Sequence, residues 1–520
     1  MIRSILSVGG FTLLSRATGF ARDVLLGAVL GAGAAADAFV IAFRLPNHFR
    51  AIFGEGAFNA AYVPAYAGAL EREGAASAHR FGSRILTLLL LSQIVVLALA
   101  WTFTPQLVEL LAPGFRDDPE KFALAVALTR ITFPYLLCIT LVTLLTGTLN
   151  AHGRYAVGAF APVILNVAMI VALACAFLFP SAAYAASYGV LASGILQLLL
   201  LAIASSRAGT LERLVWPKFD TLVRRFFRAL GPAVIGSAGV QIALFADTII
   251  GSLLPTGGVS SLYYADRLYQ LPIGVVGLAA GTVLLPTMSR AFAGENPDAA
   301  YRAQNHTMAL SLALSVPCFV AFLVIPDLLV RAAFLRGKFV AADADAAARV
   351  LAAYAAGLVP IVLIASARAS FQARGDTTTP MLIALVAIAF NVAIKIALFR
   401  PLGAAGLAVA TAVGAWINIL GLLALSWRDG SFRPSAVLGK IAAAAALGGA
   451  ALAAVFMIGQ AAALRAFASM GVVQDVAALA VLGLIGIVTY GGVLLLALLV
   501  FGVDLSALRP MRRARMKDAP

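Results

Sequence analysis

The chain has 520 residues, of which 62% are hydrophobic and only 12% are charged, whereas a soluble domain is about half apolar and about a quarter charged. This composition excludes an ordinary soluble enzyme and indicates a polytopic membrane protein. The formal net charge of +15 is typical of some nucleic-acid binders, but here the basic residues lie mainly in short loops between apolar segments. We therefore expect no nucleic-acid partner.

Apolar segments of membrane-spanning length recur along the whole chain. At about 20 residues per crossing, they predict an all-α fold with about 14 transmembrane helices. In chain order the predicted spans are 5–29, 36–53 with an extension to 66, 85–103, 124–149, 160–179, 188–204, 227–254, 260–292, 307–325, 347–371, 381–399, 406–425, 441–463 and 476–500.

Alternate loops differ in charge. The loops "EREGAASAHRFGSR", "SWRDGSFRPSAVLGK" and the tail "RPMRRARMK" are basic, whereas "GAGAAA", "PSAAYAAS" and "PTGGV" contain no basic residue. Because short basic loops stay on the cytoplasmic side of a membrane, we expect both termini to be cytoplasmic.

The sequence repeats itself at a spacing of roughly 224 residues. The segment "FARDVLLGAVLGAG" aligns with "LFADTIIGSLLPTG", so that Asp23 matches Asp247. Three prolines also recur in order, Pro46, Pro64 and Pro134 aligning with Pro272, Pro286 and Pro360. Since six predicted helices separate each helix from its copy, the two halves have the same orientation, which is a transporter architecture with the substrate between the halves.

The repeat predicts the domain organisation. Two parallel, pseudo-symmetric lobes of six helices are followed by two further helices that have no counterpart in the repeat. The predicted boundaries are 1–206 for the first lobe, 207–228 for a cytoplasmic linker, 229–427 for the second lobe, 428–508 for the last two helices and 509–520 for a basic tail.

The first predicted span carries charges that a membrane helix normally avoids. Ser15 and Arg22 share one helix face, and Arg16 and Asp23 share a neighbouring face. Arg22 near a helix end is compatible with snorkelling to headgroups, and Arg16 with a buried pair to Asp23. For either arginine alone, the structural and functional interpretations are equally good.

The second and eighth spans favour the functional interpretation. The second span adds Asp37, Asn47, Arg50 and Glu55 around a proline that bends the helix. Tyr263, Arg267 and Gln270 share a face of the eighth span beside another proline. Arginine is permanently charged and binds phosphate through two parallel hydrogen bonds, so an excess of arginines predicts an anionic, phosphate-bearing substrate. The residues assigned to this substrate are Arg16, Arg22, Arg50 and Arg267.

The second lobe contains Asp247 and Lys395 deep within spans, with Asn391 one turn before the lysine. A buried Asp–Lys pair that locks helices together is favoured over a coupling-ion site. The four histidines show no metal-ligand spacing, and no nucleophile is paired with a base. We therefore expect no metal, no cofactor and no enzymatic activity.

Three segments resemble the MurJ (MviN) family of lipid II flippases: "LLSRATGFARDVLLGAVLGAGAAADAFVIAFRLPNHFRAIFGEGAFNAAYVP", "YYADRLYQLPIGVVGLAAGTVLLPTMSRAF" and "LNAHGRYAVGAFAPVILNVAMI". The resemblance implies two six-helix lobes and a lipid groove formed by the last two helices. It implies that the four arginines line a cationic cavity, supported by Ser15, Asp37, Asn47 and Glu55.

The chain departs from the family pattern at two positions. Gln270 stands where relatives often have glutamate. Asp247, Asn391 and Thr411 match a sodium site of some relatives, but Lys395 replaces a carboxylate there, so sodium binding is not expected.

The resemblance implies a function in the bacterial inner membrane, namely moving lipid II, an undecaprenyl-diphosphate-linked disaccharide-pentapeptide, to the outer leaflet by alternating access. Membrane lipids and cell-wall synthesis proteins are the expected partners, and coupling to membrane potential or to an ion stays open. The alternatives are a flippase for another polyprenyl-diphosphate glycan, a cation-coupled drug exporter, disfavoured by the positive charge, and a membrane glycosyltransferase, disfavoured by the missing catalytic cluster.

Overall fold

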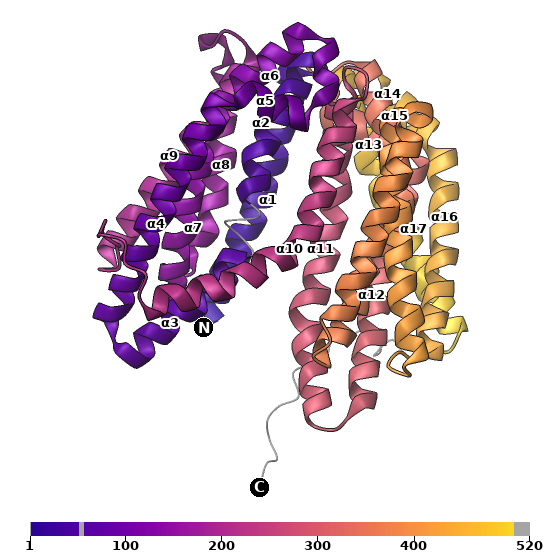
Figure 1. Ribbon diagram of the computed structural model, residues 1–520. Coiled ribbons are helices and arrows are strands. Elements are labelled where there is room, and N and C mark those ends of the chain that lie inside the picture. Colours follow the sequence, from indigo (N-terminus) through magenta and orange to yellow (C-terminus); the bar gives the residue numbers. More distant parts are fainter. Residues whose placement is uncertain (1, 51–56, 504–520) are drawn as a thin grey trace. The chain divides into compact units, whose positions relative to one another are not determined.

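The computed structural model describes residues 2–50 and 57–503, and helices account for most of them (Figure 1). Nine helical stretches of this described part are long and apolar enough to cross a membrane. The prediction of an all-α, multi-pass membrane protein is confirmed, while the count of about 14 crossings stays a prediction. Glu55 and the predicted basic tail, 509–520, lie outside the described residues.

The chain divides into two compact units. Unit 1 consists of Met1–Tyr264 and Phe334–Asp343, and unit 2 of Ala265–Ala333 and Ala344–Pro520. The lobe boundaries inferred from the repeat, which begin the second lobe at residue 229, stay a prediction.

The described residues of unit 1 form ten α-helices and the beginnings of α11 and α14. They are α1 (Ile2–Leu30), α2 (Ala34–Arg50), α3 (Ala57–Glu73), α4 (Ala75–Thr102), α5 (Thr104–Leu111), α6 (Pro119–Thr132), α7 (Tyr135–Ala151), α8 (Ala156–Ala174), α9 (Ala182–Arg207), α10 (Thr221–Ser252) and the starts of α11 (Gly258–Ala293) and α14 (Ala341–Ala373).

Small residues allow the helices of unit 1 to approach closely. A Cβ on Gly189 of α9 would lie 2.9 Å from the Cβ of Ala172 on α8, and a Cβ on Gly194 would lie 2.8 Å from the ring of Tyr135 on α7. Helices in membranes associate mainly through such close packing, because lipid offers no hydrophobic driving force. Accordingly α8 packs on both α1 and α9, and α9 also packs on α7.

Unit 2 contains the remainder of α11 and six further helices. They are α12 (Pro297–Val324), α13 (Pro326–Phe334, whose last residue belongs to unit 1), α14 (Ala341–Ala373, from Ala344 onward), α15 (Thr378–Arg428), α16 (Ala436–Ala466) and α17 (Gln474–Val500). One apolar cluster joins α12, α13, α16 and α17 around Phe456, Leu482 and Tyr490. Another joins α12, α14 and α15 around Met308 and Phe371.

The long helix α15 folds back on itself. Gly403 has a φ of 57°, which interrupts the helix just after Pro401, and only glycine adopts this left-handed conformation without cost. Asn391 Nδ2 then donates to the carbonyl of Ala410 at 3.1 Å, so the two legs run side by side. Spans 381–399 and 406–425 were predicted separately, and they form the two legs of this hairpin.

A short segment, Phe334–Asp343, returns from unit 2 to pack in unit 1. The Phe334 and Phe339 rings each lie 5.1 Å from the ring of Tyr264. The amide of Lys338 donates to the carbonyl of Ala28 in α1 at 2.8 Å. We call Phe334–Asp343 the return segment.

Candidate substrate site

Arg22 is the most buried of the predicted substrate arginines, and its guanidinium is held on two sides. It is only 6% exposed. Nε and Nη2 donate to Asp23 Oδ1 at 3.0 and 2.7 Å, and Nη1 donates to Asn166 Oδ1 at 2.9 Å. The plane of the guanidinium is therefore fixed by its neighbour in α1 and by a side chain of α8.

The partners of Arg22 are themselves held by other helices. Asn166 Nδ2 donates to the Ser15 carbonyl at 2.8 Å and to Thr18 Oγ1 at 3.1 Å. The Tyr263 hydroxyl donates to Asp23 Oδ1 at 2.8 Å. Side chains from α1, α8 and the start of α11 thus form one buried network that orients a permanent positive charge within unit 1, and we call it the Arg22 network.

Gly19 makes room for this network. A Cβ at Gly19 would lie 3.4 Å from Asn166 Nδ2, which is an ordinary contact. The spacing therefore accepts a small residue, and a larger side chain on this face of α1 would push Asn166 away from Arg22.

Asp37 is not part of the Arg22 network and has buried contacts of its own. It is fully buried, with Oδ1 accepting from the amide and the hydroxyl of Ser260, both at 2.8 Å, and Oδ2 accepting from the Gly257 amide at 2.8 Å. Lys121 Nζ lies 3.0 Å from Oδ2 and 4.2 Å from the centre of the Phe115 ring. These contacts tie α2 and α6 to the first turn of α11, where an anion is favoured by the helix dipole.

The other predicted residues of unit 1 are less enclosed. Arg50 Nε donates to Asn47 Oδ1 at 2.8 Å, which places both on one face of α2. Ser15 contributes its carbonyl to Asn166. Arg16 is exposed, and within the described residues it makes no ion pair. Two pairs of predicted residues are thus brought together, Ser15 and Arg22 through Asn166 and Asn47 and Arg50 by a direct hydrogen bond.

Arg267 and Gln270 belong to unit 2. Both share Asp266 as a partner, because Arg267 Nη2 lies 3.5 Å from Asp266 Oδ2 and Gln270 Nε2 donates to the same oxygen. Arg267 has further interactions, and its role in substrate binding stays a prediction.

The predicted coupling residues are divided between the units. Asp247 lies in unit 1 and Lys395 in unit 2, where Lys395 is 2% exposed, and their pairing stays a prediction. Thr411 Oγ1 donates to the Leu407 carbonyl at 3.0 Å, and the Asn391 amide is engaged by Ala410.

Asn166 and Lys121 were not predicted as functional residues from the sequence. The repeat contained a signal for Asn166, because "PVILNV" aligns with "AIAFNV" and so pairs Asn166 with Asn391. Asn166 donates to a backbone carbonyl of α1, and Asn391 donates to a backbone carbonyl in the other leg of α15. The burial of Lys121 could not be recognised from the sequence, because it lies in "RDDPEK", a segment typical of a solvated loop.

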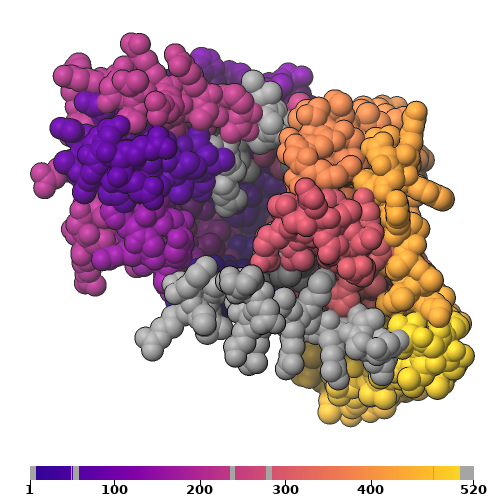
Figure 2. Space-filling model, turned by 90° about the horizontal axis from the view of Figure 1, so that it is seen from below, coloured from indigo at the N-terminus to yellow at the C-terminus, as the bar shows by residue number. Residues whose placement is uncertain are grey.

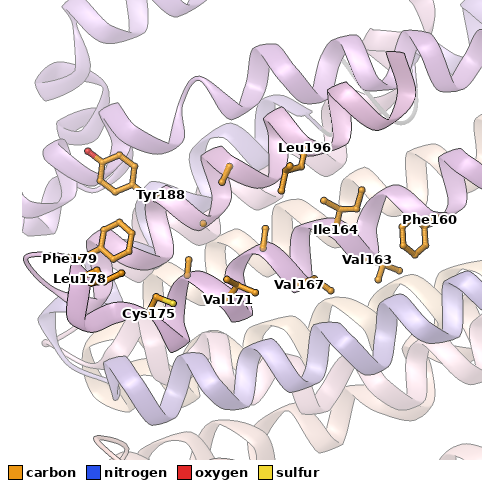
Figure 3. A pocket seen from close by; sticks show the side chains of 14 residues that line it. Phe160, Val163, Ile164, Val167, Val171, Cys175, Leu178, Phe179, Tyr188 and Leu196 are labelled. Atoms are coloured by element: carbon orange, nitrogen blue, oxygen red, sulfur yellow. The ribbon is translucent and has the colours of Figure 1, made fainter. Parts of the chain in front are cut away.

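An apolar groove lies between α8 and α9 (Figure 3). Its volume is about 500 Å³, and the residues that line it include Phe160, Val167, Val171, Tyr188 and Leu196. The rings of Phe179 and Tyr188 stack 5.7 Å apart at one end. Since the lining carries almost no polar atoms, this groove suits hydrocarbon and offers nothing to a diphosphate.

The fold and the buried arginine network define a helical membrane transporter. The fold is similar to a solved structure titled as the inward-facing conformation of a multidrug resistance MATE family transporter of the MOP superfamily, with a TM-score of 0.67, 16% identity, and coverage of 82% of this chain and 98% of that one. At this identity the likeness concerns the fold alone.

Residues 26–496 match the family model described as lipid II flippase MurJ, and the chain belongs to this family. It is 41% identical over 435 residues to a protein of Rhizobium meliloti named "Probable lipid II flippase MurJ", covering 82% of this chain and 81% of that protein. The fold also matches a structure titled "Lipid II flippase MurJ, inward closed conformation", with a TM-score of 0.76, 22% identity, and coverage of 95% of this chain and 98% of that one. The family resemblance noted in the sequence is confirmed.

Proposed function

We propose that this protein is a lipid II flippase that moves undecaprenyl-diphosphate-linked disaccharide-pentapeptide from the inner to the outer leaflet of the bacterial cytoplasmic membrane. The observation that carries the proposal is the match of residues 26–496 to the lipid II flippase family. The 41% identity to a relative of that name supports it.

The Arg22 network supplies the chemistry that this substrate needs. A guanidinium binds phosphate oxygens through parallel, charge-assisted hydrogen bonds. Asp23, itself held by Tyr263, and Asn166 hold Arg22 in place before the substrate arrives, so less conformational entropy is lost on binding. Arg16 and Arg50 in unit 1 and Arg267 in unit 2 are assigned to the same substrate from the sequence.

Transport of this kind makes and breaks no bond, so we propose no catalytic residue, metal or cofactor. The two repeated lobes would alternate in opening to either side of the membrane. Both termini are proposed to be cytoplasmic, and the membrane potential is proposed to act on the positive charge of the arginines. Cell-wall synthesis proteins are the proposed protein partners.

Translocation of labelled lipid II in vesicles tests the proposal. Arg22→Ala should abolish translocation, because the diphosphate loses its buried cation, while the variant is still inserted in the membrane. Arg130→Ala, which removes an exposed arginine, is the matched control and should translocate normally. Arg267→Ala tests the residue assigned in unit 2 by the same assay.

Normal translocation by Arg22→Ala would refute the role of the Arg22 network. Depletion in cells tests the substrate itself, since loss of the protein should leave lipid II in the inner leaflet when each leaflet is labelled separately. Unchanged lipid II together with altered capsule or O-antigen would instead identify another polyprenyl-diphosphate glycan as the substrate.

A further inference from the structure

A polar cavity of about 520 Å³ lies at the start of α10, where it meets α3 and the first turns of α4. Its lining includes Arg80 and Arg84 of α4 and Arg225 of α10. Figure 2 shows this end of unit 1, with the magenta atoms that precede and begin α10 beside the violet atoms of α3 and α4. The proposed function leaves this cavity without a role.

The two acids of the cavity are already engaged. Glu73 accepts a hydrogen bond from the Ser77 hydroxyl at 2.6 Å. Asp220 pairs with Arg84 and also caps α10, accepting from the Val223 amide at 2.9 Å. Arg80 and Arg225 are exposed, and neither forms an ion pair with another residue of the described chain. With Arg84 and Asp220 paired, the cavity presents the two guanidinium groups of Arg80 and Arg225 against the single carboxylate of Glu73, so a positive charge remains for an anion.

The segment before α10, residues 208–220, runs along α4, and we call it the strap. The Arg213 amide donates to Ser83 Oγ at 3.0 Å and the Val215 amide to Thr87 Oγ1 at 3.1 Å. Thr87 lies about 18 Å along α4 from its first residue. Because α4 is long and apolar enough to cross a membrane, a strap that follows it from its first turns is expected to reach toward the bilayer.

The strap exposes apolar side chains beside the arginines. Leu214 is 66% exposed, Trp216 83% and Phe219 56%. Tryptophan and basic residues together are typical of the boundary between headgroups and acyl chains. Apolar groups so placed would be costly in water but favourable among lipids.

We propose that this cavity binds the phosphate of an anionic phospholipid from the adjoining leaflet, through Arg80 and Arg225, while Leu214 and Trp216 of the strap insert among its acyl chains. The charge of the cavity selects an anionic headgroup, and the apolar side chains beside it select a lipid over a free anion. The site is separate from the Arg22 network and does not depend on the substrate of the flippase.

Native mass spectrometry of the full-length protein tests this site, with phosphatidylglycerol and phosphatidylcholine added separately. The double variant Arg80→Gln/Arg225→Gln should bind phosphatidylglycerol roughly tenfold or more weakly, because two charge-assisted contacts are lost. The matched control Arg72→Gln/Arg224→Gln removes the same charge from exposed neighbours that do not line the cavity, and should bind as the parent does. Arg80→Lys/Arg225→Lys should recover part of the binding.

Three results would overturn the proposal. The first is equal retention of phosphatidylglycerol by the cavity variant and its control. The second is equal binding of phosphatidylcholine and phosphatidylglycerol by the parent. The third is displacement of the lipid by inorganic phosphate at comparable concentration, which would indicate a site for the free anion. Trp216→Ser should weaken retention of phosphatidylglycerol without changing the response to inorganic phosphate.

Discussion

Arg22 and Asp37 show two uses of a buried charge within one unit. Arg22 is paired with Asp23 at 2.7 Å, while its Nη1 is turned to Asn166, a neutral partner on another helix. Asp37 is surrounded by donors and by Lys121, so its charge is compensated locally. A compensated buried pair positions helices, and it adds little net stability over an apolar pair.

Asn166→Ala tests whether the Arg22 network orients the guanidinium. The change removes the acceptor of Arg22 Nη1 and the donor to the Ser15 carbonyl. Leaving such buried groups unpaired costs about 1 to 3 kcal/mol. We expect a lower unfolding temperature in detergent and slower lipid II translocation. Val167→Ala changes an exposed neighbour and should alter neither, and equal effects of the two changes would contradict the role of Asn166.

Asp37→Asn should be strongly destabilising, because it leaves Lys121 buried without its counter-charge. Removing one partner of a buried ion pair typically costs about 3 to 5 kcal/mol. Thermal unfolding in detergent measures the loss. Asp117→Asn removes an equal charge from an exposed position and serves as the control. The double variant Asp37→Asn/Lys121→Met should recover part of the stability, and no recovery would show that Lys121 is not the cause.

At the scale of elements, the strap has its own buried carboxyl. Glu212 is 4% exposed, and it accepts hydrogen bonds from Thr148 and, at 3.4 Å, from the Tyr62 hydroxyl. Burial raises the pKa of Glu212 from 4.5 to about 7, although the Thr148 hydrogen bond opposes this rise. Nearby, the Tyr66 hydroxyl lies 3.4 Å from His152 Nε2, and burial lowers the pKa of His152.

The raised pKa predicts the pH dependence of stability. The folded state holds the Glu212 proton more tightly than the unfolded state, so the contribution is fully present below pH 4.5 and is lost as the pH rises through about 7. Its size is about 3 kcal/mol. Thermal unfolding across this range should show the loss in the parent and a smaller one in Glu212→Gln. Identical pH profiles of the two proteins would contradict the prediction. Because His152 is present in both, its contribution to the pH dependence of stability cancels in the comparison.

The return segment depends on one glycine. Gly337 has a φ of +59°, and a Cβ there would lie 2.2 Å from the Ala28 carbonyl oxygen. Gly337→Ala should therefore displace the segment from α1 and lower the free energy of unfolding by at least about 2 kcal/mol. Gly430→Ala is the control, because Gly430 has a similar φ of +68° with open space around it. Equal unfolding temperatures for the two variants would exclude the clash.

At the scale of the whole molecule, the sequence predicted the features that follow from hydrophobicity. Membrane-length apolar runs predicted an all-α, multi-pass chain. The recurring prolines indicated the internal repeat, and three segments, the first of which contains "ARDVLLG", resembled the family. The hairpin of α15 was also predictable, since 381–399 and 406–425 are separate apolar runs. The predicted span 124–149 lies within one membrane-length stretch, Pro119–Ala151, with a local break at Phe133 and Pro134 between α6 and α7.

Contacts between distant residues could not be predicted in the same way. Asn166 approaches Arg22 across 144 residues, and Ser260 approaches Asp37 across 223. Periodicity assigns a side chain to a face of its own helix, but it does not say which helix lies opposite. Arg22 and Asp37 were therefore recognisable as unusual, while their partners were not.

The return segment also limits how the gene can be recombined. The chain leaves unit 1 after Tyr264, comes back at Phe334 and leaves again after Asp343, so no single cut separates the units. A hybrid that takes everything after Tyr264 from a relative would set a foreign loop against the native Tyr264 and Ala28. Hybrids that keep residues 334–343 with the parent's α1 should be recovered more often in a functional screen. Natural recombination between related genes is expected to keep residues 334–343 together with α1, so these ten residues would share the ancestry of the first helix.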